Sequence, residues 1–133
     1  MKKLLTYLFL TSALCALVYS CKKEGEIELD INQDLISIDF LTPLNNESIH
    51  IGAESHINGL IDANNFLGGW TIQGTEMNTK EILFEFTESS IQNSYFFDFH
   101  WTPNLQAQVC IKINVLDLDQ KVVKSDSITV ICI

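Results

Sequence analysis

The sequence predicts an all-β domain in which antiparallel strands form a sandwich. From residue 36 to the C-terminus, apolar and polar residues alternate with a period of two in one segment after another, which is the pattern of strands that bury one face. Turn-forming residues interrupt these segments at short intervals. No stretch of this region sustains the apolar stripe of a core-facing helix.

The first three predicted strands follow from this alternation. The strand at 36–40 alternates apolar with polar residues and ends in a proline-containing turn at 42–46. The second strand, 49–57, places five side chains on one face: Ile49, Ile51, Ala53, Ser55 and Ile57. A polar loop at 62–65 follows, and the third strand, 67–73, is entered through two glycines.

Four further strands complete the prediction. A polar turn at 74–79 leads to the fourth strand, 82–86, and aromatic residues mark one face of the fifth, 95–101. A second proline-containing turn separates it from the sixth strand, 109–115, which is followed by the seventh, 122–133. Seven short strands in about 98 residues are typical of an immunoglobulin-like β-sandwich, with Trp70 in the place of its buried tryptophan. A small antiparallel barrel is the alternative.

Residues 1–20 predict a lipoprotein signal peptide. A short basic start precedes an uncharged run of 16 residues, which is shorter than the about 20 residues that span a bilayer. The run ends in Val18-Tyr19-Ser20-Cys21, which resembles a bacterial lipobox. This resemblance implies that Cys21 becomes the lipidated N-terminus. A plain secretory signal and an uncleaved anchor are the alternatives.

Residues 21–35 predict a flexible tether between the lipid and the domain at 36–133. The stretch after Cys21 is rich in charge and has neither helix nor strand periodicity. It is similar to the segment behind the acylated cysteine of many Bacteroidota surface lipoproteins. Permanent membrane anchoring through the lipid at Cys21 is therefore expected.

A weak resemblance covers the predicted domain as well. Its motifs are Ile38-x-Phe40-Leu41-x-Pro43, Gly52, Gly59-Leu60-Ile61-Asp62, Leu67, Val115-Leu116-Asp117-x-Asp119 and Ile128-x-Val130. They are similar to immunoglobulin-like, cadherin-like domains of small Bacteroidota lipoproteins of uncharacterised function. The resemblance implies this fold and a place at the outer membrane or cell surface, facing outward or toward the periplasm. It implies no ligand.

The acidic charge narrows the class of partner. The chain has a formal net charge of −9, and all eight of its basic residues are lysine. Nucleic-acid binding requires a basic stripe to neutralise phosphates, so no nucleic-acid partner is expected. The absence of arginine argues against bidentate recognition of carboxylates or phosphates.

Three groups of residues are candidate sites. Asp62, Asp117 and Asp119 fall in loops predicted at one end of the sandwich, where their oxygens suit Ca²⁺; otherwise no cofactor is expected. Trp101 and Phe96 are candidates for stacking on a glycan. Cys110 and Cys132 lie on adjacent strands, but their positions predict opposite faces, so a disulfide would need a bulge.

The histidines form a fourth candidate group. Glu54 and His56 share a predicted strand face with His50, and His100 alternates with Asp98 on another strand. Glu54 and His56 are spaced to share a metal ion, provided that a neighbouring strand supplies a third ligand. A solvated sheet face without metal is the alternative.

No motif of nucleophilic catalysis is present, so the sequence predicts a protein that is not an enzyme. We expect an envelope lipoprotein that acts as a binding or structural module for a protein or glycan partner. The alternative is a glycan-binding accessory lipoprotein that uses exposed aromatic residues.

Overall fold

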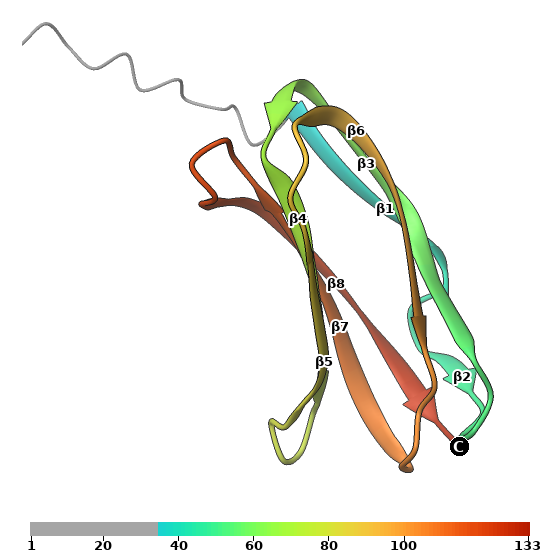
Figure 1. The fold of residues 1–133 in the computed structure, drawn as a ribbon. Coiled ribbons are helices and arrows are strands. Elements are labelled where there is room, and N and C mark those ends of the chain that lie inside the picture. The colour runs from blue at the N-terminus through green and yellow to red at the C-terminus, as the bar shows by residue number, and fades with distance from the viewer. Residues whose placement is uncertain (1–34) are drawn as a thin grey trace, which may run out of the picture. The chain divides into compact units, whose positions relative to one another are not determined.

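The computed structural model describes residues 35–133, which form eight strands (Figure 1). The strands are β1 (Ile36–Thr42), β2 (Glu47–Ile49), β3 (Ser55–Leu67), β4 (Gly69–Glu76), β5 (Ile82–Glu88), β6 (Gln92–Trp101), β7 (Ala107–Leu116) and β8 (Val122–Cys132). The predicted signal peptide at 1–20, the predicted lipidation site Cys21 and residues 22–34 of the predicted tether lie outside the described residues. Within residues 35–133 no helix is long and apolar enough to cross a membrane.

The strands form two separate sheets that pack face to face. One sheet has three strands in the order β1-β3-β6, and the other has five in the order β2-β8-β7-β4-β5. Neighbours pair antiparallel except for β2, which pairs parallel to β8. This arrangement confirms the predicted immunoglobulin-like sandwich, and two open sheets exclude the single closed barrel.

The period-two alternation decides which side chains enter the core. The three-stranded sheet buries Ile57 and Ile61 of β3 and Phe97 of β6 completely. The five-stranded sheet buries Ile72 of β4 and alternate residues of β7 against them. Fully burying one such side chain contributes about 1.5–3 kcal/mol relative to leaving it exposed. Trp70 is also buried and its ring packs against Phe97, as the sequence predicts.

The predicted second strand, 49–57, is wrong because a turn divides it. β2 ends at Ile49 and β3 begins at Ser55, which raises the number of strands from seven to eight. Gly52 has a φ of +79°, in the left-handed region that favours glycine. Ile51, predicted to face inward, is exposed in this turn. Apolar and polar residues happen to alternate through this turn as well, so the sequence pattern did not reveal the end of β2 and the start of β3.

The predicted loop at 62–65 is also wrong, because these residues extend β3. Backbone pairing with β1 continues as far as Ala63, opposite Ile36. On the other side, pairing with β6 stops at Asp62 and resumes at Leu67. Polar residues are tolerated here because this part of β3 is a bulge at the end of the sheet and is largely exposed.

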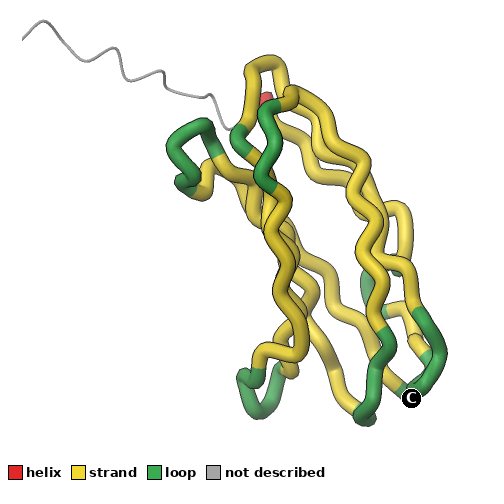
Figure 2. Tube along the Cα trace, in the orientation of Figure 1, coloured by secondary structure: helices red, strands yellow, loops and turns green. Residues whose placement is uncertain are grey.

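Connections gather at the two ends of the sandwich (Figure 2). One end holds the start of β1, the β3–β4 connection and the β7–β8 turn, where Gly68 N–H donates to the Leu116 carbonyl at 2.8 Å. The opposite end holds the β1–β2, β4–β5 and β6–β7 connections and the C-terminus (Figure 1). We call this second end the distal end, because it lies away from the start of β1.

Candidate functional site

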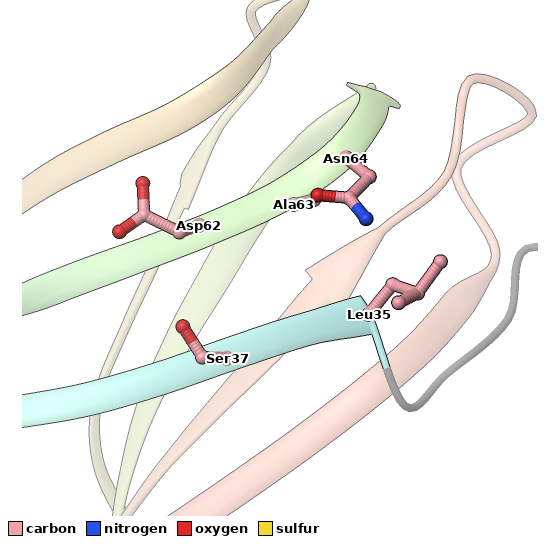
Figure 3. A pocket seen from close by; sticks show the side chains of 5 residues that line it. All are labelled: Leu35, Ser37, Asp62, Ala63 and Asn64. Atoms are coloured by element: carbon pink, nitrogen blue, oxygen red, sulfur yellow. The ribbon is translucent and has the colours of Figure 1, made fainter.

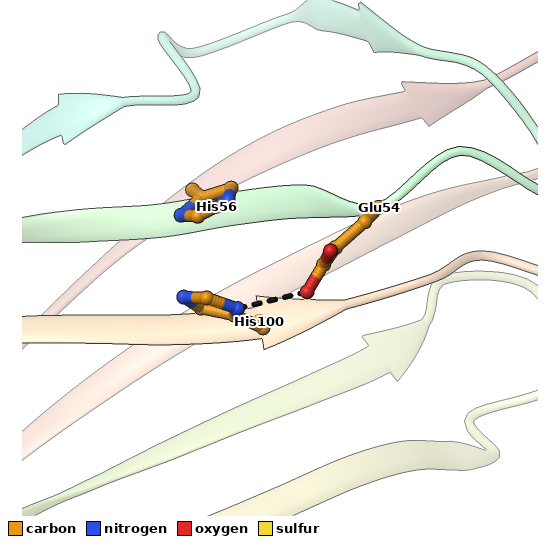
Figure 4. Close-up of side chains that lie close together, drawn as sticks. All are labelled: Glu54, His56 and His100. Atoms are coloured by element: carbon orange, nitrogen blue, oxygen red, sulfur yellow. Dashed lines mark hydrogen bonds and ion pairs between the residues drawn. The ribbon is translucent and has the colours of Figure 1, made fainter.

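Two histidines and a glutamate meet on the outer face of the three-stranded sheet (Figure 4). His56 lies near the start of β3 and pairs directly with His100, near the end of β6. Glu54 stands in the turn just before β3. Alternation explains the placement, since Ile57 and Phe99 next to the histidines point to the core and leave both imidazoles outside. The three residues therefore form a cluster at the distal part of the sheet.

The donor atoms of this cluster are close together. One ligand atom each from Glu54, His56 and His100 lies within 4.8 Å of the other two. His100 Nδ1 is 2.8 Å from Glu54 Oε1, and the two imidazole centroids are 4.0 Å apart. All three side chains are exposed. The cluster is therefore open to solvent and to small ions.

Asp98 adds a second carboxylate beside the two rings. It lies two residues before His100 on the same face of β6 and pairs with Asn58. Its Oδ1 is 3.4 Å from His56 Nδ1, and its Oδ2 is 3.5 Å from His100 Nε2. Asp98 thus contacts both imidazoles from one side, while Glu54 contacts His100 from the other.

The carboxylates of Glu54 and Asp98 affect the pKa of His100. The pKa of His100 is raised above its ordinary value, first by the hydrogen bond to Glu54 and then by Asp98, while partial desolvation opposes the shift. The protonated imidazole is favoured because it donates to both carboxylates. In neutral form, the same ring nitrogens are metal ligands.

The sequence predicted only part of this cluster. It placed Glu54 and His56 together and required a third ligand from a neighbouring strand, which His100 now supplies. It also placed His50 on the same face, but His50 lies in the turn that divides the predicted strand and is outside the group. In an immunoglobulin-like sandwich the strands here called β3 and β6 are neighbours, and that rule would have placed the strand of His100 beside the strand of His56, although it does not fix their register.

The structure does not bring Asp62, Asp117 and Asp119 together as metal ligands within residues 35–133. Asp62 lies on β3, where it lines a pocket of about 290 Å³ with Leu35, Ser37, Ala63 and Asn64 (Figure 3). This pocket contains one carboxylate, whereas Ca²⁺ takes six to eight oxygen ligands. The loop at 62–65 that the sequence predicts for this group is instead part of β3, so the calcium site on the three aspartates stays a prediction.

Asp117 instead closes the β7–β8 turn. Its Oδ1 accepts hydrogen bonds from the backbone N–H groups of Asp119 at 2.9 Å and Lys121 at 2.8 Å. Gln120 adopts a φ of +64° in the same turn. Aspartate commonly stabilises turns in this way by accepting from nearby backbone groups. Asp117 therefore has a structural role.

The two candidate glycan-binding aromatics lie on opposite faces of β6. Trp101 is partly buried and packs against the core, with its ring 4.9 Å from that of Phe84. Phe96 lies on the outer face and is 62 % exposed. The two residues consequently do not form one platform, and Phe96 is the more exposed of the two.

Cys110 and Cys132 are free thiols in the structure. Cys110 pairs with Thr129, and Cys132 pairs with Ala107. The cysteines are thus three residues out of register, about 10 Å along the strands, whereas a disulfide requires Cα atoms within about 7 Å. No bulge compensates, because the β7–β8 register is unbroken between these pairs.

Comparisons with known proteins bear on the fold alone. No protein-family model matches the chain, and no curated protein matches it in sequence. Among solved structures, the chain is similar to the CARDB domain of a Pyrococcus furiosus protein, crystallised in complex with di-metal ions. The TM-score is 0.48 and the sequence identity 11 %, over 74 % of this chain and 85 % of that one. The description of this fold therefore rests on the chain's own strand order.

Proposed function

We propose that this protein is a non-enzymatic binding module that a lipid on Cys21 holds at the outer membrane or cell surface, with its distal end offered to an envelope partner. The basic start, the short apolar run and the lipobox-like residues before Cys21 support the anchor. The strand order supports the orientation, because β1 begins at the end opposite the distal end. An anchor that precedes β1 leaves the distal loops farthest from the membrane.

The observation that carries this proposal is the set of exposed apolar side chains on ordered distal connections. Leu44 is 63 % exposed in the β1–β2 connection, and Ile51 and Ile133 are also exposed. Ile51 N–H donates to the Ile133 carbonyl at 2.9 Å, and Leu44 N–H donates to Glu47 Oε2 at 2.6 Å. Apolar groups held in place in this way bind a partner with little loss of conformational entropy.

The end near the start of β1 also exposes apolar residues, including Leu118, which is 56 % exposed. Exposure by itself therefore does not choose between the two ends. The proposed anchor favours the distal end as the binding surface, because the chain enters β1 at the same end as Leu118. The two ends supply a matched pair of positions for an experiment.

The anchor is tested by replacing the acylated residue. Wild-type chain expressed in a Bacteroidota host should sediment with membranes, and mass spectrometry should find an acylated N-terminal cysteine at position 21. Cys21→Ser should release the domain into the soluble envelope fraction, whereas Cys15→Ser should not. Unmodified Cys21 in membrane-bound protein would refute this part of the proposal.

The orientation is tested by site-specific cross-linking in cells. A photo-reactive amino acid at position 44 should cross-link to a discrete envelope component, and the same group at position 118 should not. Because the two sites have similar exposure, the comparison controls for nonspecific capture. Identical products from both positions would argue against a distal binding surface.

A second candidate function is glycan binding through Phe96. Phe96 is exposed and lies directly opposite Leu60 of β3 in the strand register, and Asp98 follows two residues later on the same face of β6. An exposed ring beside a hydrogen-bonding carboxylate suits a sugar, whose apolar face stacks while its hydroxyls donate. Calorimetric titration with oligosaccharides should give binding that Phe96→Ala removes. Trp101→Phe serves as the control, because Trp101 packs against the core.

A further inference from the structure

We propose that Glu54, His56 and His100 form a binding site for a divalent transition metal of the zinc type. The inference is independent of the membrane anchor and of the distal partner. It concerns a site on the outer face of the three-stranded sheet that residues from β3, β6 and the preceding turn build together (Figure 4).

The first argument is the spacing of the donor atoms. Zinc bonds to histidine nitrogen and carboxylate oxygen are about 2.0–2.2 Å long, so neighbouring ligand atoms in a tetrahedral site lie about 3.3–3.5 Å apart. Here the three ligand atoms lie within 4.8 Å of one another, and one pair is at 2.8 Å. Small rotations of exposed side chains therefore bring all three to bonding distance, without backbone movement.

The second argument is the chemistry of the donors. Two imidazoles and one carboxylate form a ligand set that zinc uses in sites with an open fourth position. Imidazole nitrogen favours zinc, copper and nickel, whereas calcium and magnesium prefer oxygen. The site therefore selects against Ca²⁺. A bound divalent ion would also offset the negative charge of Glu54 and Asp98.

The third argument is preorganisation by the backbone. His56 and His100 are directly opposed in an antiparallel pair, which sets their Cβ atoms about 4.5–5.5 Å apart. Backbone hydrogen bonds fix the turn that carries Glu54. Among them, Gly52 N–H donates to the Pro103 carbonyl at 2.9 Å, and Ala53 N–H donates to the His50 carbonyl at 3.2 Å. The three side chains therefore start from fixed backbone positions.

Asp98 completes the site as an outer partner. It contacts ring nitrogens of both histidines, at 3.4 and 3.5 Å. A carboxylate that accepts from the free N–H of a metal-bound imidazole holds the ring in orientation and increases its basicity. Loss of such a partner typically weakens metal binding by about 10–100-fold.

The test uses the full chain, chelator-treated and then titrated with ZnCl₂ by calorimetry at slightly alkaline pH. We expect saturable binding of one ion, with histidine ring signals in NMR spectra that shift on saturation. His56→Ala and His100→Ala should each weaken binding by more than about tenfold, and Glu54→Gln should weaken it as well. The matched control is His50→Ala, an exposed histidine in the adjacent turn, which should bind like wild type.

Three outcomes would overturn the proposal. The first is the absence of saturable zinc binding, which would leave the cluster as a hydrogen-bonded group without metal. The second is an equal loss of affinity in His50→Ala and His56→Ala, which would indicate nonspecific binding. The third is full competition by CaCl₂ at equal concentration. Circular dichroism of each metal-free variant controls for folding, and all four positions are exposed, so folded variants are expected.

Discussion

The imidazole rings of His56 and His100 lie opposite each other on paired strands, with centroids 4.0 Å apart and planes inclined by 50°. Two imidazolium rings at this distance would repel each other, because like charges that are close together raise the energy of both. Glu54 and Asp98 contact the pair and offset that repulsion. The four residues are thus electrostatically coupled, and a change in one should be measurable in the others.

Glu54→Gln should lower the pKa of His100 in metal-free protein. The hydrogen bond from His100 to the Glu54 carboxylate is the largest cause of the raised pKa, and a neutral amide cannot supply the same attraction. A raised pKa stabilises the fold fully below the ordinary value of 6.5, and this contribution is lost as pH rises through the folded-state value. NMR titration of the His100 ring measures the shift. An unchanged titration in Glu54→Gln would contradict it, and Glu81→Gln is the control.

Glu76→Gln should destabilise the protein at neutral pH but much less in acid. The pKa of Glu76 is lowered by hydrogen bonds from the Thr79 side chain and from the backbone N–H groups of Asn78 and Thr79. A lowered pKa stabilises the fold above the ordinary value of 4.5, and the contribution is lost as pH falls through the lower folded-state value. The difference in Tm between variant and wild type should therefore narrow in acid. An equal difference in Tm at neutral and at acid pH would contradict this prediction.

Gly59→Ala should destabilise the sandwich by about 1–3 kcal/mol, the usual cost of overpacking. Gly59 is directly opposite Phe97, whose ring covers it. An added Cβ would lie 2.5 Å from Phe97 Cζ and 2.2 Å from the Asp39 carbonyl oxygen, which belongs to the backbone of β1. Urea unfolding measures the loss, with the exposed Ser94→Ala as reference. Equal stability of the two variants would show that β1 can move aside.

Cys110 and Cys132 should both be free in protein purified without reductant, and they should differ in reactivity. Cys132 is 1 % exposed and burial raises its thiol pKa, so it should be alkylated only after unfolding. Cys110 is partly exposed and should react in the folded protein. Peptide mass spectrometry after iodoacetamide treatment distinguishes the two. A disulfide-linked peptide containing both residues would show that β7 and β8 pair differently.

The burial pattern was predictable because alternation is a local property of the chain. The inward residues of β6, from Tyr95 to Trp101, and those of β7, from Val109 to Val115, are the ones that alternation assigns to the core. The division of β2 from β3 was not predictable in the same way. Ile51 and Ala53 continue the alternation, but the segment is held in a turn because Ile51 N–H and Gly52 N–H donate to the distant carbonyls of Ile133 and Pro103.

The candidate sites also depend on contacts between distant parts of the chain, which the sequence pattern does not reveal. Asp117 lies in a turn as predicted, and its carboxylate accepts hydrogen bonds from the backbone N–H groups of Asp119 and Lys121, whereas Asp62 lies on β3. Trp101 and Phe96 are both aromatic residues of one strand, but an odd sequence separation places them on opposite faces. The sequence shows that the two side chains lie on opposite faces of the strand. Sheet packing determines which of those faces is exposed to solvent.

By itself, the sequence determined the all-β class, the inward faces of β6 and β7 and the proximity of Glu54 to His56. Each of these depends on residues a few positions apart. Only the tertiary structure decided that His100, 46 residues from Glu54, joins them. The physical reason is that strand order and register arise from packing two sheets around a common core, and this packing determines which outward side chains meet.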